Sequence, residues 1–187
     1  MPFLSIKGQQ IFFAFREGRA ASKQSLLLIH GAGGSHLDWP PEIRNMVAVN
    51  VYAMDLPGHG RSALPGCSSI SDYADIVAAF IEAIDVAKVI LIGHSMGGAI
   101  VQSIGLRPPS RVEGLVLVAS GARLRVAPEI LEGVVREFER TADLIAELAW
   151  SENTPDRLKQ LGKRMLLTCD PKTVYGDYVA CNGFDLM

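Results

Sequence analysis

The chain has 187 residues with 18 lysines and arginines, 20 aspartates and glutamates, a formal net charge of -2 and 49% hydrophobic residues, which is typical of one globular domain that can bury a core. The near-neutral net charge offers no basic surface for a polyanion, so we expect no nucleic-acid partner. No apolar run approaches the roughly 20 residues that span a bilayer, and the first ten residues lack the pattern of a secretory signal, so we expect a cytoplasmic protein without a membrane partner.

The first 120 residues alternate short apolar runs with helical patterns. Residues 3–6 and 9–17 flank a Lys7-Gly8 turn and predict an opening hairpin. Four runs rich in valine, isoleucine and leucine predict buried strands, at residues 26–30, 49–55, 88–93 and 114–120. The clearest helix is predicted over residues 69–86, where Ser71 can cap the start. Buried strands that alternate with helices predict an α/β fold, with helices on both faces of a mostly parallel sheet.

Charge density marks a boundary near Gly121. Residues 1–120 hold 18 charged side chains, whereas the following 67 residues hold 20. The second part is predicted to form three helices, over residues 127–150, 154–167 and 170–187. We therefore assign residues 1–122 to a core that contains the six strands, and residues 123–187 to a helical layer built on that core.

The segment Gly93-His-Ser95-Met-Gly97 follows a predicted strand and precedes a helical pattern. The sharp turn of such a G-x-S-x-G nucleophile elbow forces the serine into a strained backbone conformation and lifts its hydroxyl above the sheet. The amino end of the following helix points at the serine, where its partial positive charge favours a developing oxyanion. Ser95 is therefore the candidate nucleophile.

Two further motifs precede the elbow, each after a predicted strand. They are His30-Gly31-Ala32-Gly33-Gly34 and Asp55-Leu-Pro-Gly-His-Gly-Arg-Ser62. In order and spacing, the three motifs together resemble those of the α/β-hydrolase fold superfamily, in its lipase, esterase and C–C hydrolase branch. The resemblance covers essentially the whole chain, and residues from about Arg123 onward are similar to the helical cap that this family inserts after its sixth strand.

The resemblance implies a role for each matched residue. Ser95 would be the nucleophile, and the backbone N–H groups of Ala32 and Met96 would form the oxyanion hole. A serine nucleophile implies an acyl-enzyme, so esters, thioesters, lactones or activated ketones are the implied small-molecule substrates. It excludes the alkyl-enzyme chemistry of the haloalkane dehalogenases and epoxide hydrolases, which place an aspartate at the elbow.

The candidate substrate pocket lies beside the oxyanion loop and comprises Gly31, Gly33, His36 and Trp39. The glycines let the backbone turn its N–H groups toward a substrate without a blocking side chain. Two readings stay open for His36 and Trp39. They line the mouth of the pocket, or they form a packed indole beside an exposed imidazole.

The histidines all precede the candidate nucleophile, at positions 30, 36, 59 and 94. The family places an acid and then a histidine after the nucleophile, and Asp185 resembles a residue at the cap exit rather than that acid. The chain therefore resembles an amino-terminal portion of such a hydrolase, with the carboxy-terminal strands and the catalytic Asp and His missing. Because removal of a triad costs several orders of magnitude in rate, we expect this chain alone to be inactive or very weak.

Structural roles are expected for the upstream polar residues. We expect His30 and His94 to point away from the serine, and His59 and Arg61 to brace the loop through Asp55 and neighbouring carbonyls. The strand around residues 115–118 would expose an apolar edge, which we expect to recruit a second copy or a complementing segment.

The cysteines, at positions 67, 169 and 181, are an odd number without metal-ligand spacing. This pattern favours free thiols in a reducing compartment over a disulfide framework. We expect no metal and no cofactor, and we expect Cys169 and Cys181 to be small buried hydrophobes on cap helices.

The motifs leave the chemistry open. An acyltransferase, a lyase or a cofactor-free perhydrolase can use the same scaffold, because the fold and the elbow do not fix the reaction. A non-catalytic module that binds a small ligand is an alternative from another class. A fluorophosphonate probe labels a serine in an activated environment and ignores an unactivated one. An unlabelled chain would not separate a binding module from a truncated enzyme, and supplying the missing strands would.

Overall fold

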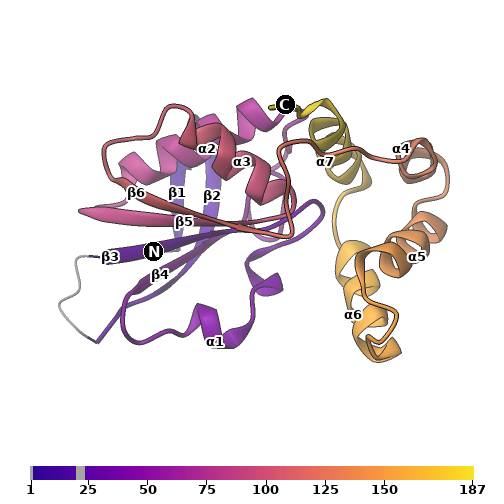
Figure 1. The fold of residues 1–187 in the computed structure, drawn as a ribbon, viewed down its shortest axis with the longest axis horizontal. Coiled ribbons are helices and arrows are strands. Elements are labelled where there is room, and N and C mark those ends of the chain that lie inside the picture. The colour runs from indigo at the N-terminus through magenta and orange to yellow at the C-terminus, as the bar shows by residue number, and fades with distance from the viewer. Residues whose placement is uncertain (1, 20–23) are drawn as a thin grey trace.

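The structure is a computed structural model, and it describes residues 2–19 and 24–187 (Figure 1). Six strands form one sheet in the order β1-β2-β4-β3-β5-β6. Their bounds are β1 (Phe3–Ile6), β2 (Gln9–Arg16), β3 (Gln24–Ile29), β4 (Asn50–Met54), β5 (Lys88–His94) and β6 (Val112–Val118). β1 and β2 are antiparallel, and β2 is antiparallel to β4, whereas β4, β3, β5 and β6 are parallel neighbours. The predicted α/β fold with a mostly parallel sheet is confirmed.

Helices cover both faces of the sheet. Figure 1 shows α2 (Ile70–Ala83) and α3 (Met96–Gly105) on one face, and η1 (His36–Asp38) and α1 (Pro41–Arg44) belong to the other. Alternate residues of β5 serve the two layers, because successive side chains of a strand point to opposite faces. Leu91 packs in the core cluster of α2 and α3, whereas Ile90 and Ile92 pack beside the buried Trp39.

The helix α2 starts two residues earlier than its expected cap implied. Ser69, not Ser71, is the N-cap, and its hydroxyl accepts the backbone N–H of Asp72. The hydroxyl of Ser69 also donates to the Asp72 carboxylate at 2.6 Å. This reciprocal arrangement satisfies the free N–H of the first turn and leaves Ser71 exposed on the helix.

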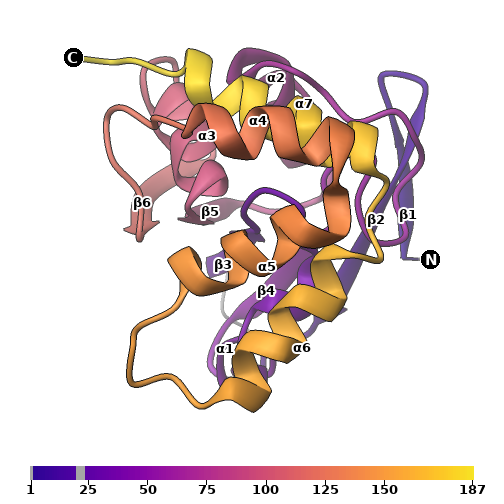
Figure 2. The ribbon, with the colours of Figure 1, turned by 90° about the vertical axis from the view of Figure 1, so that its right-hand side faces the viewer.

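Four helices form the cap: α4 (Pro128–Arg136), α5 (Phe138–Ala149), α6 (Asp156–Leu166) and α7 (Pro171–Gly183). The prediction of one helix over residues 127–150 is wrong, because the backbone leaves the helical region at Glu137, with φ -144° and ψ 60°. The break folds α5 back on α4, so that Thr141 lies against Gly133 and donates its hydroxyl to the Glu137 carbonyl oxygen. Figure 2 shows the resulting layer, in which α4 and α7 lie side by side.

The two ends of the cap segment are paired with each other where the chain leaves and rejoins the core. Arg123, before α4, pairs with Asp185, after α7, through an Nε to Oδ2 distance of 2.8 Å. Arg125 contacts the same carboxylate at 3.1 Å. A hydrogen bond from the Met187 N–H and the two arginines lower the pKa of Asp185, and together they outweigh desolvation, which acts in the opposite direction. None of the helices in the described ranges is long and apolar enough to cross a membrane.

Candidate active site

Ser95 occupies a strained turn between β5 and α3. Its backbone has φ 52° and ψ -116°, a conformation that side-chain-bearing residues rarely adopt. The N–H of Ser95 donates to the Val118 carbonyl oxygen at 2.9 Å, which ties the elbow to the end of β6. A Cβ atom on Gly93 would collide with the backbone of Gly97, and a Cβ on Gly97 would collide with the Ile29 carbonyl oxygen. Only glycine therefore fits on either side of the serine.

The oxyanion loop runs from Gly31 to Gly34 beside Ser95. A Cβ atom on Gly31 would lie 3.3 Å from Ser95 Cβ, so the loop and the elbow are in van der Waals contact. Within the residues that the structure describes, the backbone N–H groups of Ala32 and Met96 donate to no protein acceptor. Met96 is the first residue of α3, where the helix leaves its N–H groups free. The two N–H groups are thus available to a ligand.

His30 supports the oxyanion loop from below. It is fully buried, and its Nε2 accepts the Leu56 N–H at 3.0 Å. The other ring nitrogen must then carry the proton, which Nδ1 donates to the Gly31 carbonyl oxygen at 2.8 Å. Burial, and then the neighbouring His59, lower the pKa of His30 well below 6.5. His30 is therefore neutral and committed to the loop, in agreement with the expectation that it does not serve Ser95.

His94 lies on the opposite face of the sheet from α3. Its exposed ring shares the face of Ile92 and faces Trp39, with the ring centroids 6.4 Å apart. Burial of part of the ring lowers its pKa. Among the described residues, no histidine forms a hydrogen bond with the Ser95 hydroxyl. The structure therefore brings the Ser95 hydroxyl and two free N–H donors together, and no histidine among the described residues is bonded to that hydroxyl.

Asp55 organises the loop after β4, with one departure from expectation. The buried carboxylate accepts the Arg61 N–H at 2.9 Å, and both the backbone N–H and Nδ1 of His36 bond to it. The guanidinium of Arg61 lies over the Phe12 ring, 4.2 Å from its centroid. The expected contact of His59 with a neighbouring carbonyl is present, since Nδ1 lies 2.9 Å from the Pro57 carbonyl oxygen. The expected bond to Asp55 is absent, because Nε2 bonds instead to the carboxylate of Asp177, on α7.

Asp177 is the site residue that the sequence did not reveal. It is fully buried, and its carboxylate accepts three donors: Gly33 N–H at 2.8 Å, His59 Nε2 at 2.7 Å and Tyr73 hydroxyl at 2.6 Å. These partners lie 144, 118 and 104 residues away in the sequence. A single acidic residue in a helical pattern carries no local signal of such contacts.

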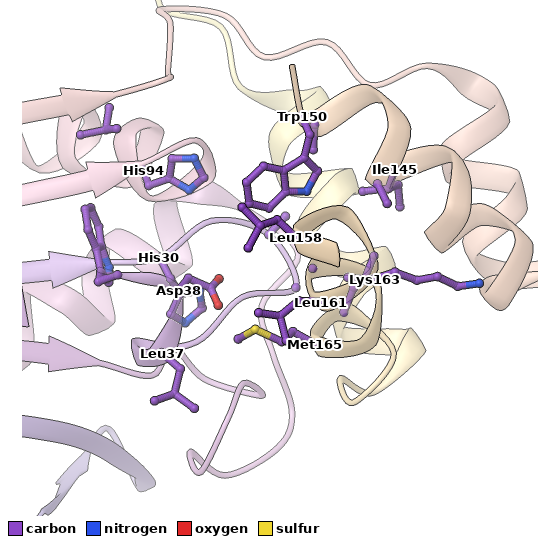
Figure 3. A pocket seen from close by; sticks show the side chains of 18 of the residues that line it. His30, Leu37, Asp38, His94, Ile145, Trp150, Leu158, Leu161, Lys163 and Met165 are labelled. Atoms are coloured by element: carbon purple, nitrogen blue, oxygen red, sulfur yellow. The ribbon is translucent and has the colours of Figure 1, made fainter. Parts of the chain in front are cut away.

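A cavity of about 670 Å³ opens between the sheet and the cap helices α5 and α6 (Figure 3). Its walls are mainly apolar, and Ala32, Gly33 and Trp39 belong to them. Gly31 is buried beneath the loop instead. His36 lines a second cavity, of about 660 Å³, on the other side of Asp38. The structure thus gathers two of the four candidate pocket residues around the first cavity.

The cysteines are unpaired, as expected. Cys181 is buried on α7, whereas Cys169 lies between α6 and α7 and donates its thiol proton to the Gly33 carbonyl oxygen at 3.0 Å. Cys169 is therefore a specific hydrogen-bond donor rather than a small hydrophobe. Within the described ranges, no group of three or more histidine, cysteine, aspartate or glutamate residues could hold a metal ion.

A mostly parallel sheet, a serine at a strained turn from strand to helix and a helical cap over the strand ends define the α/β-hydrolase class. The chain matches the alpha/beta hydrolase family over residues 26–181. The chain belongs to this family. The solved structures that it resembles include esterases.

Similar proteins share the core but are longer. The chain is 37% identical to the dihydrolipoyllysine-residue acetyltransferase component of the acetoin cleaving system of Pseudomonas putida over 120 residues, which are 63% of this chain and 32% of that protein. It is 33% identical to the pimeloyl-[acyl-carrier protein] methyl ester esterase of Pectobacterium carotovorum over 135 residues, 66% of this chain and 51% of the relative. A solved thermophilic esterase superposes with a TM-score of 0.81 and 32% identity, over 99% of this chain and 69% of that one. The chain thus spans about a third to a half of these curated relatives.

Proposed function

We propose that this chain carries the nucleophile and the oxyanion hole of a serine hydrolase that acts on carboxylic esters. The observation that carries the proposal is the positive φ of Ser95, at the turn from β5 into α3. Strained backbone of this kind persists where the surrounding structure holds a side chain in a reactive position. The Ser95 oxygen would attack the ester carbonyl carbon, its proton would pass to the leaving alcohol, and the acyl group would stay on Ser95.

The free N–H groups of Ala32 and Met96 support the second part of the proposal. Preorganised donors of this kind stabilise the negative charge that develops on the carbonyl oxygen, and loss of one donor typically costs about 10²- to 10³-fold in kcat. The amino end of α3 adds its partial positive charge at the same place. Both donors belong to the backbone, so their positions depend on how the loop and the helix are held.

The cavity beside the elbow supports a small ester with an apolar group. Its volume of about 670 Å³ lies in the range of small-molecule sites, about 300–1,000 Å³. Leu158, Leu161 and Met165 of α6 face it from the cap (Figure 3). The ammonium of Lys163 is neutralised by Asp143 at 2.6 Å. Such walls favour a neutral, apolar acyl or alcohol group.

The catalytic base is proposed to come from outside the described residues. The exposed edge strand β6 would place such a base close to the serine, because the end of β6 lies beside the elbow: the Val118 carbonyl oxygen accepts the Ser95 N–H. All four residues from Leu115 to Val118 are between 38% and 45% exposed, which is unusual for a run of large apolar side chains in a strand. We propose that a complementing strand, from another segment or a second copy, pairs with β6 and ends beside Ser95.

Labelling with a fluorophosphonate, read by intact mass, tests the proposal. We expect slow addition of one phosphonyl group, no addition to the Ser95→Ala variant, and hydrolysis of a short activated ester several orders of magnitude below that of a complete triad. A turnover near tens per second that needs Ser95 would contradict the proposed absence of a base. Binding of a small apolar ester without any labelling would favour the non-catalytic module. An acylated Ser95 that passes its acyl group to an added alcohol, amine or peroxide would favour a transferase or perhydrolase.

A further inference from the structure

Gly33, the residue after the proposed oxyanion donor Ala32, is contacted by three side chains of the cap. Its N–H donates to Asp177 Oδ2 at 2.8 Å, and its carbonyl oxygen accepts the Cys169 thiol at 3.0 Å. A Cβ atom on Gly33 would overlap the Leu166 side chain. Gly33 itself has φ +61°, which glycine adopts without strain. Both polar atoms of this residue, which belongs to the core loop, are thus bonded by side chains of the cap.

The carboxylate that holds Gly33 is fully satisfied although it is buried. Besides the Gly33 N–H, it accepts His59 Nε2 and the Tyr73 hydroxyl. Tyr73 lies on α2 and is itself fully buried. A buried carboxylate persists only when it is paired and hydrogen-bonded. One cap residue therefore joins the oxyanion loop, the loop after β4 and a core helix.

The hydrogen bonds of His59 show that it carries a positive charge. Nε2 faces Asp177 at 2.7 Å, and Nδ1 faces the Pro57 carbonyl oxygen at 2.9 Å. Both partners are acceptors, so both ring nitrogens must carry protons. Burial alone would lower the pKa of His59, but the charge and hydrogen bond of Asp177, the Pro57 carbonyl and the charge of Asp55 together outweigh it and raise the pKa. His59 and Asp177 form a buried ion pair.

The titratable groups around His59 come from several elements: Asp177 on α7, Tyr73 on α2, Asp55 after β4, Asp38 in η1 and His30 after β3. The ring of His30 lies 4.8 Å from that of His59 and is neutral, so it adds no charge to the pair. On the other side of Gly33, burial and the neighbouring Asp177 raise the pKa of the Cys169 thiol to about 12. The thiol therefore keeps the proton that it donates.

We propose that Asp177 and Cys169 are positioning residues of the oxyanion hole, through which the cap holds the peptides on both sides of Gly33 and so restricts the backbone of Ala32, whose N–H would face a substrate. The inference rests on the proposed function of Ser95. The two bonds fix the Ala32–Gly33 and Gly33–Gly34 peptide planes. The first of these planes begins at the Cα atom of Ala32, so the bond to Asp177 limits rotation of the Ala32 backbone, although the Ala32 N–H itself lies in the preceding peptide. A cap that is loosened would leave Ser95 in place and let the oxyanion donor turn away.

Four variants of the full 187-residue chain test this role. Asp177→Ala removes the acceptor of the Gly33 N–H, and Cys169→Ala removes the donor to its carbonyl oxygen. Cys169→Ser is the conservative variant that restores a donor. Cys181→Ala is the matched control, because Cys181 is a buried cysteine on the helix of Asp177 that forms no hydrogen bond with the oxyanion loop among the described residues.

The first readout is amide NMR, which does not depend on catalysis. We expect the Gly33 amide to exchange with solvent at least about tenfold faster in Asp177→Ala, and the Ala32 amide resonance to move in both alanine variants. Cys169→Ser should bring the Ala32 resonance back toward its original position, and Cys181→Ala should leave both signals unchanged. If Asp177→Ala does not fold, Asp177→Asn and the two Cys169 variants still decide the question.

The second readout is the rate of fluorophosphonate addition to Ser95. We expect a decrease of about tenfold in Asp177→Ala and Cys169→Ala, rescue in Cys169→Ser and no decrease in Cys181→Ala. Unchanged amide signals in folded Asp177 and Cys169 variants, or equal changes in Cys181→Ala, would overturn the inference. A chain that is never labelled would contradict the proposed function instead, and the NMR signals would still show whether the cap holds the loop.

Discussion

His30 donates its Nδ1 proton to the Gly31 carbonyl oxygen across 2.8 Å, and this bond sets the direction of the Ala32 N–H group. The two groups belong to one peptide unit, in which the C=O and the N–H point in opposite directions. The Gly34 N–H donates to the same oxygen at 3.1 Å. The carbonyl oxygen is thus held toward the core, which aims the Ala32 N–H outward.

Replacement of His30 by alanine should therefore lower both stability and reactivity. It leaves the buried Leu56 N–H without an acceptor, a change that typically costs about 1–3 kcal/mol, and it releases the Gly31 carbonyl oxygen. We expect a lower free energy of unfolding in urea and slower fluorophosphonate labelling of Ser95. His94→Ala is the control for stability, because its ring is exposed. Equal stability of the two variants would contradict the role assigned to His30.

The strained backbone of Ser95 predicts that two substitutions of this residue both abolish labelling but differ in their free energy of unfolding. Ser95→Ala keeps a side chain at φ 52°, whereas Ser95→Gly removes it. A residue in a sparsely populated conformation costs of order 1–3 kcal/mol, so we expect the glycine variant to be more stable than the alanine variant by about 1 kcal/mol. Urea unfolding measures the difference, and both variants should resist labelling. If the alanine variant were the more stable of the two, Ser95 would not be strained.

The two buried histidines, His30 and His59, predict opposite effects of pH on the stability of the fold. The pKa of His59 is raised by folding, so its contribution is complete below pH 6.5, its ordinary value, and is lost as the pH rises through the folded pKa. The pKa of His30 is lowered by folding, so its contribution is complete above pH 6.5 and is lost as the pH falls. We therefore expect the urea midpoint to be highest near pH 6.5, to decrease as the pH falls below that value because of His30, and to decrease at higher pH because of His59.

A His59→Gln variant is the test of that assignment. Glutamine cannot titrate, so the alkaline decrease attributed to His59 should shrink while the acid decrease remains. An alkaline limb of unchanged slope in the variant would show that another group is responsible.

The exposed edge of β6 predicts association. Pairing of an apolar edge strand with another strand is expected at high concentration, and light scattering should show species larger than one chain. Leu117→Lys, at a position that is 45% exposed in the strand, should reduce association, because an edge charge opposes pairing. Leu148→Lys, on the exposed surface of α5, is the matched control. A strictly monomeric chain at all concentrations would contradict the proposal for this edge.

The parts of the fold that follow from local patterns could be predicted from the sequence. The Lys7-Gly8 turn, with φ 47° and 83°, and the strained Ser95 both lie at short motifs whose residues carry the signal themselves. The break at Glu137 carried no glycine or proline signal, because it results from the packing of Thr141 on Gly133.

The site was predictable to the extent that it is local. Ser95, Ala32 and Met96 lie in motifs that neighbour one another along strand ends. The role of Asp177 could not be predicted, since its three partners come from three separate segments of the core. His59 was assigned to Asp55, its neighbour in the sequence, because nothing local shows that the ring turns toward the cap.

The pairing of Arg123 with Asp185 makes the cap a loop that is closed at its base. The chain enters and leaves this layer at one point. The entropy of closing a loop grows only slowly with length, by roughly 0.6 kcal/mol for each doubling. Changes of length in α5 and in the connection from α5 to α6 would therefore disturb the sheet and the elbow little, whereas α7 is packed into the core. Evolution or a protein engineer could exchange α5 and α6, which face the cavity, provided that the partners of Gly33 and the contacts of α7 are kept.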